Sequence, residues 1–172
     1  PDTHVMGNVQ ALSNLSQLTD LYLSDTAVSG TVEALAGLTQ MKALYLPNTD
    51  VSGSVEALAG LTLMTLLSLS NTDISGSVEA LASMTQLVHL DVSRTLLQGS
   101  LAPLRACTAL VRLNVSHNCF SSGLDALLDV VALPALLEVD VSANCFERTR
   151  LPEFVPQEDP TPFLLDIRAN TF

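Results

Sequence analysis

The chain has 172 residues, of which 48% are apolar and 4% aromatic, enough to bury one substantial core. Its formal net charge of -11 argues against nucleic acid or an anionic membrane as the main partner. The most apolar stretch, residues 127–137, is interrupted by Asp129 and Pro134, so no run is long enough to cross a bilayer.

A repeat of 23 residues dominates the sequence. LYLSDTAVSGTVEALAGLT, residues 21–39, returns 23 residues later as LYLPNTDVSGSVEALAGLT. With the first apolar residue as position 1, a half-unit from Gly7 precedes seven units, which start at Leu18, Met41, Met64, Leu87, Leu110, Leu136 and Pro162. This repetition predicts a single domain over residues 1–172, in which each unit stacks on the next. Because the chain opens at Pro1 partway through a unit, we expect it to belong to a longer protein.

The first half of each unit predicts a short strand. Positions 4 and 6 are apolar in every unit, as in Leu44 and Leu46, which is typical of a strand with one buried face. Position 11 is apolar again, and Phe172 holds it in the last unit. Position 9 carries a side chain that bonds backbone groups in turns. These residues are Thr26, Thr49, Thr72, Thr95, Asn118, Asn144 and Asn170.

The second half of each unit predicts a turn and a short helix. A glycine (Gly30, Gly53, Gly76, Gly99) stands where we expect the chain to turn off the strand layer. The next residue (Thr31, Ser54, Ser77, Ser100) is expected to cap the helix, with Glu33, Glu56 and Glu79 in its first turn. Three extra residues in the fifth unit predict a longer helix within residues 123–134. The prolines of residues 151–162 predict an extended or turned segment.

The pattern L-x-x-L-x-L-x-x-(N/T)-x-(V/L/F) over the whole chain resembles the leucine-rich repeat family. VSGSV, residues 51–55, resembles the L-x-G-x-I stretch of the plant-type subclass, and the threonine units resemble repeats of trypanosomatid surface antigens and proteophosphoglycan-like proteins. The sequence departs from the family pattern in two ways: the first four units have threonine in place of the usual asparagine at position 9, and no flanking cysteine cluster is visible. The resemblance implies an α/β fold: a right-handed solenoid, or horseshoe segment, with a parallel β-sheet on its concave face. It also favours a cell-surface or secreted location over a cytoplasmic one.

Columns of equivalent outward residues on the strands are the candidate binding surface. Tyr22 and Tyr45 hold position 5 in adjacent units, and tyrosine often anchors interfaces, although the pair could also be inherited duplication. Leu66 lies beside them at position 3. A second patch could equally be an ordinary solvated surface; it comprises His89, Asp91, Arg94, Arg112, Asn114 and His117. Four of the seven basic residues fall on this face, which favours a partner with acidic or polar groups.

The same residues do not predict an enzyme, a metal site or a cofactor. His89, Asp91 and Ser93 could be written as a triad, but residues two apart on one strand project in a single row. An open sheet also gives no enclosing geometry for a metal at His89, Asp91 and His117.

Cysteines and glycosylation sequons leave the compartment open. Cys107 replaces a leucine or methionine of earlier units, so we expect a small buried residue. Cys119 and Cys145 share position 10 of adjacent units, a spacing compatible with a disulfide but equally with free thiols. Asn14 and Asn114 begin formal sequons, which matter only in a secreted protein; a glycan on Asn114 would obstruct the strand face.

Three functions fit these observations. The first is non-enzymatic recognition of a protein or a glycan through the concave strand face. The alternative is a structural spacer or surface-coat segment without a specific ligand, and the third is a scaffold for a catalytic domain elsewhere in a longer protein. Outward position 5 changes from tyrosine to serine to aspartate while the inward positions barely change, which favours recognition.

Overall fold

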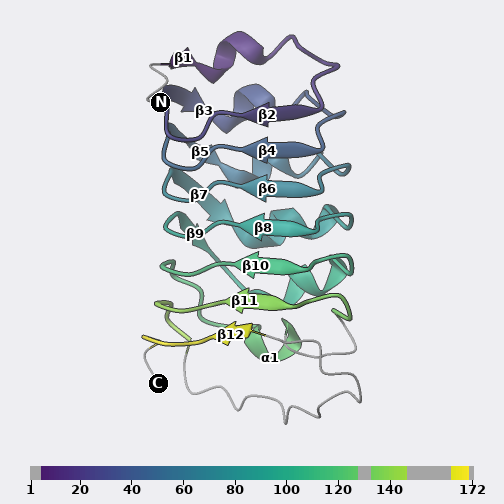
Figure 1. Cartoon of the computed structure of the whole chain (residues 1–172), viewed down its shortest axis with the longest axis vertical. Coiled ribbons are helices and arrows are strands. Elements are labelled where there is room, and N and C mark those ends of the chain that lie inside the picture. Colours follow the sequence, from purple (N-terminus) through teal and green to yellow (C-terminus); the bar gives the residue numbers. More distant parts are fainter. Residues whose placement is uncertain (1–4, 128–132, 147–163, 171–172) are drawn as a thin grey trace.

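A computed structural model describes residues 5–127, 133–146 and 164–170 and shows a stack of coils (Figure 1). One strand from each coil joins a seven-stranded parallel sheet in the order β12-β11-β10-β8-β6-β4-β2. These strands are β2 (Asp20–Tyr22), β4 (Ala43–Tyr45), β6 (Leu66–Ser68), β8 (His89–Asp91), β10 (Arg112–Asn114), β11 (Glu138–Asp140) and β12 (Leu164–Asp166).

The register of this sheet places equivalent repeat positions side by side. Leu44 of β4 pairs with Leu21 on one side and with Leu67 on the other. The extra three residues of the fifth unit do not shift the register, because Leu113 pairs with Val139. The insertion is therefore absorbed outside the strands, and the predicted columns continue along the sheet.

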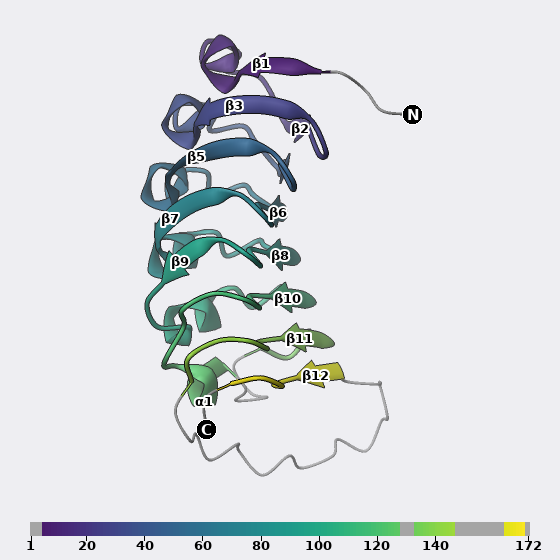
Figure 2. The ribbon, with the colours of Figure 1, turned by 90° about the vertical axis from the view of Figure 1, so that its left-hand side faces the viewer.

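A second parallel sheet covers the adjoining side of the stack (Figure 2). Its strands, in the order β1-β3-β5-β7-β9, are β1 (Met6–Asn8), β3 (Ala27–Thr31), β5 (Asp50–Ser54), β7 (Asp73–Ser77) and β9 (Leu96–Gln98). Sequence analysis missed this sheet and expected a turn at its glycines. Gly30, Gly53 and Gly76 lie inside these strands, with φ of 104°, 105° and 112°, a region that side-chain-bearing residues avoid.

Short helices form the side of the stack opposite the seven-stranded sheet, which lies on the inner side of its curve (Figure 2). The described residues contain five 3-10 helices: η1 (Val9–Leu12), η2 (Val32–Leu35), η3 (Val55–Leu58), η4 (Val78–Ser83) and η5 (Ala102–Ala106). The fifth unit contributes α1 (Leu124–Leu127). Most of the predicted extension of this helix, the proline-rich segment 151–162, Pro162 and Phe172 lie outside the described residues.

The predicted helix caps are wrong for the first two full units. Neither Thr31 nor Ser54 accepts a capping hydrogen bond from a backbone N–H of its helix, whereas Ser77 accepts one from the Glu79 backbone. The glutamates instead bind the next coil: Glu33 Oε1 accepts from the Ser54 N–H at 2.8 Å. Glu56 Oε1 accepts from the Ser77 N–H at 2.8 Å.

Glutamate carboxylates pack against the backbone of two of the strand glycines, Gly53 and Gly76. A Cβ built on Gly53 would lie 2.3 Å from Glu33 Oε2, and one on Gly76 would lie 2.1 Å from Glu56 Oε2. The carboxylate of one coil therefore occupies the space that a side chain would need in the next. This contact holds the helical side of adjacent coils together.

The core is a continuous set of columns between the two sheets and the helices. Leu44, Leu67 and Leu87 are fully buried, as are Val51 and Phe120 at position 11. Burying one such side chain contributes about 1.5–3 kcal/mol, so the columns supply the main stabilising free energy.

The threonines and asparagines of position 9 make different hydrogen bonds. Thr72 Oγ1 donates to Leu69 O of its own coil at 2.6 Å. The amide of Asn118 reaches the preceding coil as well, because Nδ2 donates to Val92 O at 2.7 Å and Oδ1 accepts from the Thr95 N–H at 3.2 Å. Asn118 therefore joins two coils, whereas the hydroxyls of Thr26, Thr49 and Thr72 bond only to their own turns.

The difference predicts unequal costs of truncation. We expect Asn118→Ala to lower the free energy of unfolding by about 2–4 kcal/mol, because several buried backbone groups lose a partner. We expect Thr72→Ala to cost about 1 kcal/mol, since one backbone carbonyl loses its partner. Urea denaturation of the two variants measures both values. Equal costs would contradict the assignment of inter-coil coupling to asparagine.

The glutamate contacts predict sensitivity to acid. The Ser54 backbone N–H lowers the pKa of Glu33 below its ordinary 4.5, and the Ser54 hydroxyl and Ser77 N–H lower the pKa of Glu56. A lowered folded-state pKa stabilises the protein above the unfolded value near 4.5, and this stabilisation disappears as pH falls through the folded values. In thermal melts, Glu33→Gln/Glu56→Gln should therefore lower Tm most at pH 7 and least near pH 3. If the Tm difference between the parent and the double variant did not narrow in acid, the ionised glutamates would not be the source of the stabilisation.

Candidate functional site

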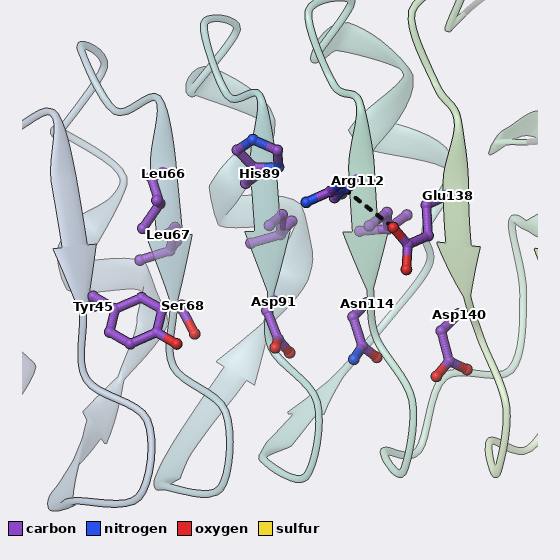
Figure 3. A pocket seen from close by; sticks show the side chains of 12 residues that line it. Tyr45, Leu66, Leu67, Ser68, His89, Asp91, Arg112, Asn114, Glu138 and Asp140 are labelled. Carbon is purple, nitrogen blue, oxygen red and sulfur yellow. Dashed lines mark ion pairs between the residues drawn. The ribbon is translucent and has the colours of Figure 1, made fainter. Parts of the chain in front are cut away.

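The exposed face of the seven-stranded sheet carries two rows of side chains across the strands. Because position 4 points into the core, positions 3 and 5 on either side of it point outward. Figure 3 shows Leu66, His89, Arg112 and Glu138 in one row and Tyr45, Ser68, Asp91, Asn114 and Asp140 in the other.

These rows border a cavity of about 460 Å³ on the sheet. Its lining draws on five successive strands from β4 to β11, so the stacking of coils alone brings it together. Leu67, Leu90 and Leu113 of the buried column contribute to its lining. The cavity therefore combines apolar surface with polar and charged side chains, as ligand sites do.

Tyr22 and Tyr45 form an aromatic pair at one end of this cavity. Their ring centroids are 6.0 Å apart and the rings are inclined by 38°. Tyr22 is 59% exposed, whereas Tyr45 is half-buried and also lines the cavity. The pair offers aromatic surface at little cost in side-chain entropy.

Backbone groups of the following turn fix the polar residues of position 5. Asp91 Oδ1 accepts from the Ser93 N–H at 3.0 Å and from the Ser93 hydroxyl at 2.7 Å. Asn114 Oδ1 accepts from the Ser116 N–H at 3.0 Å, and Asp140 Oδ1 from the Ser142 N–H at 2.9 Å. These side chains are therefore oriented before any ligand arrives.

The arginines of this face are paired with acidic neighbours. Arg112 Nε lies 3.1 Å from Glu138 Oε2, and both side chains are largely exposed. Arg168 binds Asp166 through its guanidinium, and this contact lowers the pKa of Asp166 to about 2. Half of the four strand-face cations are thus neutralised locally, which weakens the expectation of an acidic partner.

Arg94 and His117 lie on the turn after the strand and not in the cavity. Every position 8 residue has a left-handed backbone, with φ of 53° at Arg94 and 56° at His117. Arg94 Nη2 is 3.2 Å from His117 Nε2. Asn71 donates to Asn48 one coil away at 2.9 Å. Position 8 is therefore a column of turn residues, and some neighbours in it contact each other between coils.

The structure therefore divides the predicted site residues into three groups. The cavity gathers six of them: Tyr45, Leu66, His89, Asp91, Arg112 and Asn114. Tyr22 adjoins it through Tyr45, while Arg94 and His117 lie apart on the turns. Sequence analysis did not select Ser68, Glu138 and Asp140, although membership of the same columns is the signal that identifies them.

The geometry around His89 does not form a catalytic triad. The Ser93 hydroxyl donates to Asp91, so it is not held by the imidazole. No group of three His, Cys, Asp or Glu side chains suited to a metal is found within residues 5–127, 133–146 and 164–170. No helix in the described part of the chain is long and apolar enough to span a bilayer.

The cysteines are all free thiols. Cys107 is fully buried, as expected, and burial raises its pKa to about 11. Cys119 and Cys145 are exposed and unbridged.

Comparison with solved structures gives a consistent set of neighbours. The plant peptide hormone receptor RGFR1, in complex with RGF2, is 20% identical over 97% of this chain, with a TM-score of 0.79. The ectodomain of the Arabidopsis receptor kinase HAESA, bound to an extended IDA peptide hormone, is 28% identical over 83% of this chain, with a TM-score of 0.73. A leucine-rich repeat protein of Leptospira interrogans is 16% identical over 94% of this chain, with a TM-score of 0.70. This chain covers 40% of that protein.

This chain covers only 27% of the RGFR1 chain and 24% of the HAESA chain. No protein-family model and no curated protein sequence matches it. The 23-residue coil, the parallel register and the fold shared with these structures nevertheless agree. The chain is a leucine-rich repeat solenoid.

Proposed function

We propose that the chain is a non-enzymatic recognition module that binds a polypeptide through the concave face of its seven-stranded sheet. The observation that carries this proposal is the cavity across β4 to β11 beside the exposed tyrosine pair. A pure spacer has no need for an aromatic pair on one face. Both plant receptors compared above are described with a bound peptide hormone or hormone partner, which favours a polypeptide ligand here.

The tyrosine pair is the expected anchor of this interface. A side chain that is exposed in the free protein and becomes covered on binding removes apolar area from water, and tyrosines at interface centres often dominate binding energy. Tyr22 is the more exposed of the two and Tyr45 connects it to the cavity. Leu66 extends the same apolar area onto β6.

Truncating the pair should abolish most partner binding without unfolding the chain. We expect Tyr22→Ala/Tyr45→Ala to weaken capture of the partner at least about ten-fold, the effect of a typical hot spot. Affinity purification from extracts of source cells, quantified by mass spectrometry, measures the loss. Arg105→Ala, an exposed residue on η5 at the opposite side of the coil, is the matched control and should retain every partner.

Two results would redirect the proposal. Equal recovery of all partners by the parent and the double variant would refute the tyrosine anchor and favour a spacer. Binding on a glycan array that the double variant loses would keep the site but make the ligand a carbohydrate. Circular dichroism of both variants checks that the solenoid is intact.

A further inference from the structure

We infer that the ligand of this face is an extended polypeptide segment with a basic side chain four residues away from an aromatic or aliphatic one. The inference rests on the proposed function and adds the chemistry and spacing of the partner. Three features of the cavity support it: its residual charge, the orientation of its carboxylates and the distance between its apolar and acidic ends.

The residual charge of the cavity is negative. Three carboxylates line it, on Asp91, Glu138 and Asp140, together with one guanidinium, on Arg112. Arg112 is paired with Glu138, and among the described residues neither Asp91 nor Asp140 forms an ion pair. Arg168 on the next coil attracts Asp140, but its guanidinium is bonded to Asp166. The chain as a whole carries a formal charge of -11, which also attracts cationic ligands over a longer range.

Both carboxylates are held with one oxygen available. The hydrogen bonds that Asp91 and Asp140 accept within the described residues fall on Oδ1. No described residue donates to Oδ2 of either, so this oxygen is oriented to accept from a guanidinium or an ammonium. Asn114 lies between them and uses its own Oδ1 in the same way, so its amide NH₂ is free to donate to a peptide carbonyl.

The opposite end of the cavity is apolar and aromatic. Tyr45 and Leu66 line it, and Tyr22 continues the aromatic surface beyond it. A ligand side chain placed here removes apolar surface from water. An anionic ligand gains nothing from this end and is repelled at the other, so the two ends together select for a segment that is apolar and basic.

The strand spacing sets the distance between the two ligand side chains. Asn114, midway between the carboxylates, lies three strands from Tyr45, which is about 14 Å at roughly 4.8 Å per strand. An extended peptide advances about 3.3 Å per residue, so four residues cover about 13 Å. Residues four apart also lie on the same face of an extended chain, as simultaneous contact requires.

A peptide selection tests the inference directly. The probe is a phage-displayed library of random 12-residue peptides, selected on the whole chain and depleted on an Asp91→Asn/Asp140→Asn variant. The asparagines keep the Oδ1 acceptor, as Asn114 does in the coil between them, so the variant should fold. We expect the recovered peptides to carry Lys or Arg four residues from Phe, Tyr, Trp or Leu.

Synthetic peptides from the selection then test the charge pairing. We expect the affinity, measured by fluorescence anisotropy, to fall about ten-fold for Asp91→Asn/Asp140→Asn and by a similar factor when the basic residue becomes Gln. The two changes should not add, because they remove the same interaction. Asp50→Asn/Asp125→Asn, at exposed positions of β5 and α1 outside the cavity, removes the same number of charges and should leave affinity unchanged.

The outcomes separate this inference from the proposed function. Peptides without a basic residue that still require Tyr22 and Tyr45 would overturn the inference and leave the concave face as the binding surface. Recovered peptides that are insensitive to Asp91→Asn/Asp140→Asn, or a selection that enriches no peptide, would also overturn it. Peptides that require neither the carboxylates nor the tyrosines would count against both.

Discussion

The surface of this protein depends on one constraint, the parallel pairing of position 4 residues with their equivalents one coil away. Because Leu21, Leu44 and Leu67 pair in register and point inward, their neighbours on each strand point outward in straight rows. A one-residue shift would reverse the two faces and bury the polar rows. The cavity therefore exists only because the core columns fix the register over several coils.

The coils are held together differently along the stack. In the first units, the second sheet and the glutamates that pack over Gly53 and Gly76 join adjacent coils outside the core. From Asn118 onward, buried amides take over this role, since each donates to the backbone of the preceding coil. The cavity spans the junction between the two regimes, and its lining strands keep their register across it.

The repeat pattern was sufficient to predict the strands of the seven-stranded sheet, their register and the outward columns, because each follows from apolar alternation at a fixed period; it did not predict the second sheet. Other features depend on contacts between coils, which a single unit does not reveal. From the sequence, Glu33 is expected to complement the dipole of its own helix. In the structure, its carboxylate also accepts a hydrogen bond from the Ser54 N–H of the next coil. The sequence places Arg94 on the strand face, but its left-handed backbone puts it on the turn after the strand. Asp25 and Asn48 hold the same repeat position in other coils, and aspartate and asparagine tolerate a left-handed backbone. These two residues were the signal in the sequence that position 8 is a turn.

The row of position 5 has a structural role as well as a proposed binding role, and the two can be separated by charge. Asp91, Asn114 and Asp140 all accept a hydrogen bond from the serine two residues later, so a carbonyl-type oxygen is what the turn requires. Asn114 satisfies this requirement without a charge. The turn therefore explains the aspartate-or-asparagine choice but not the charge at Asp91 and Asp140, and the proposed basic ligand is what gives that charge a role.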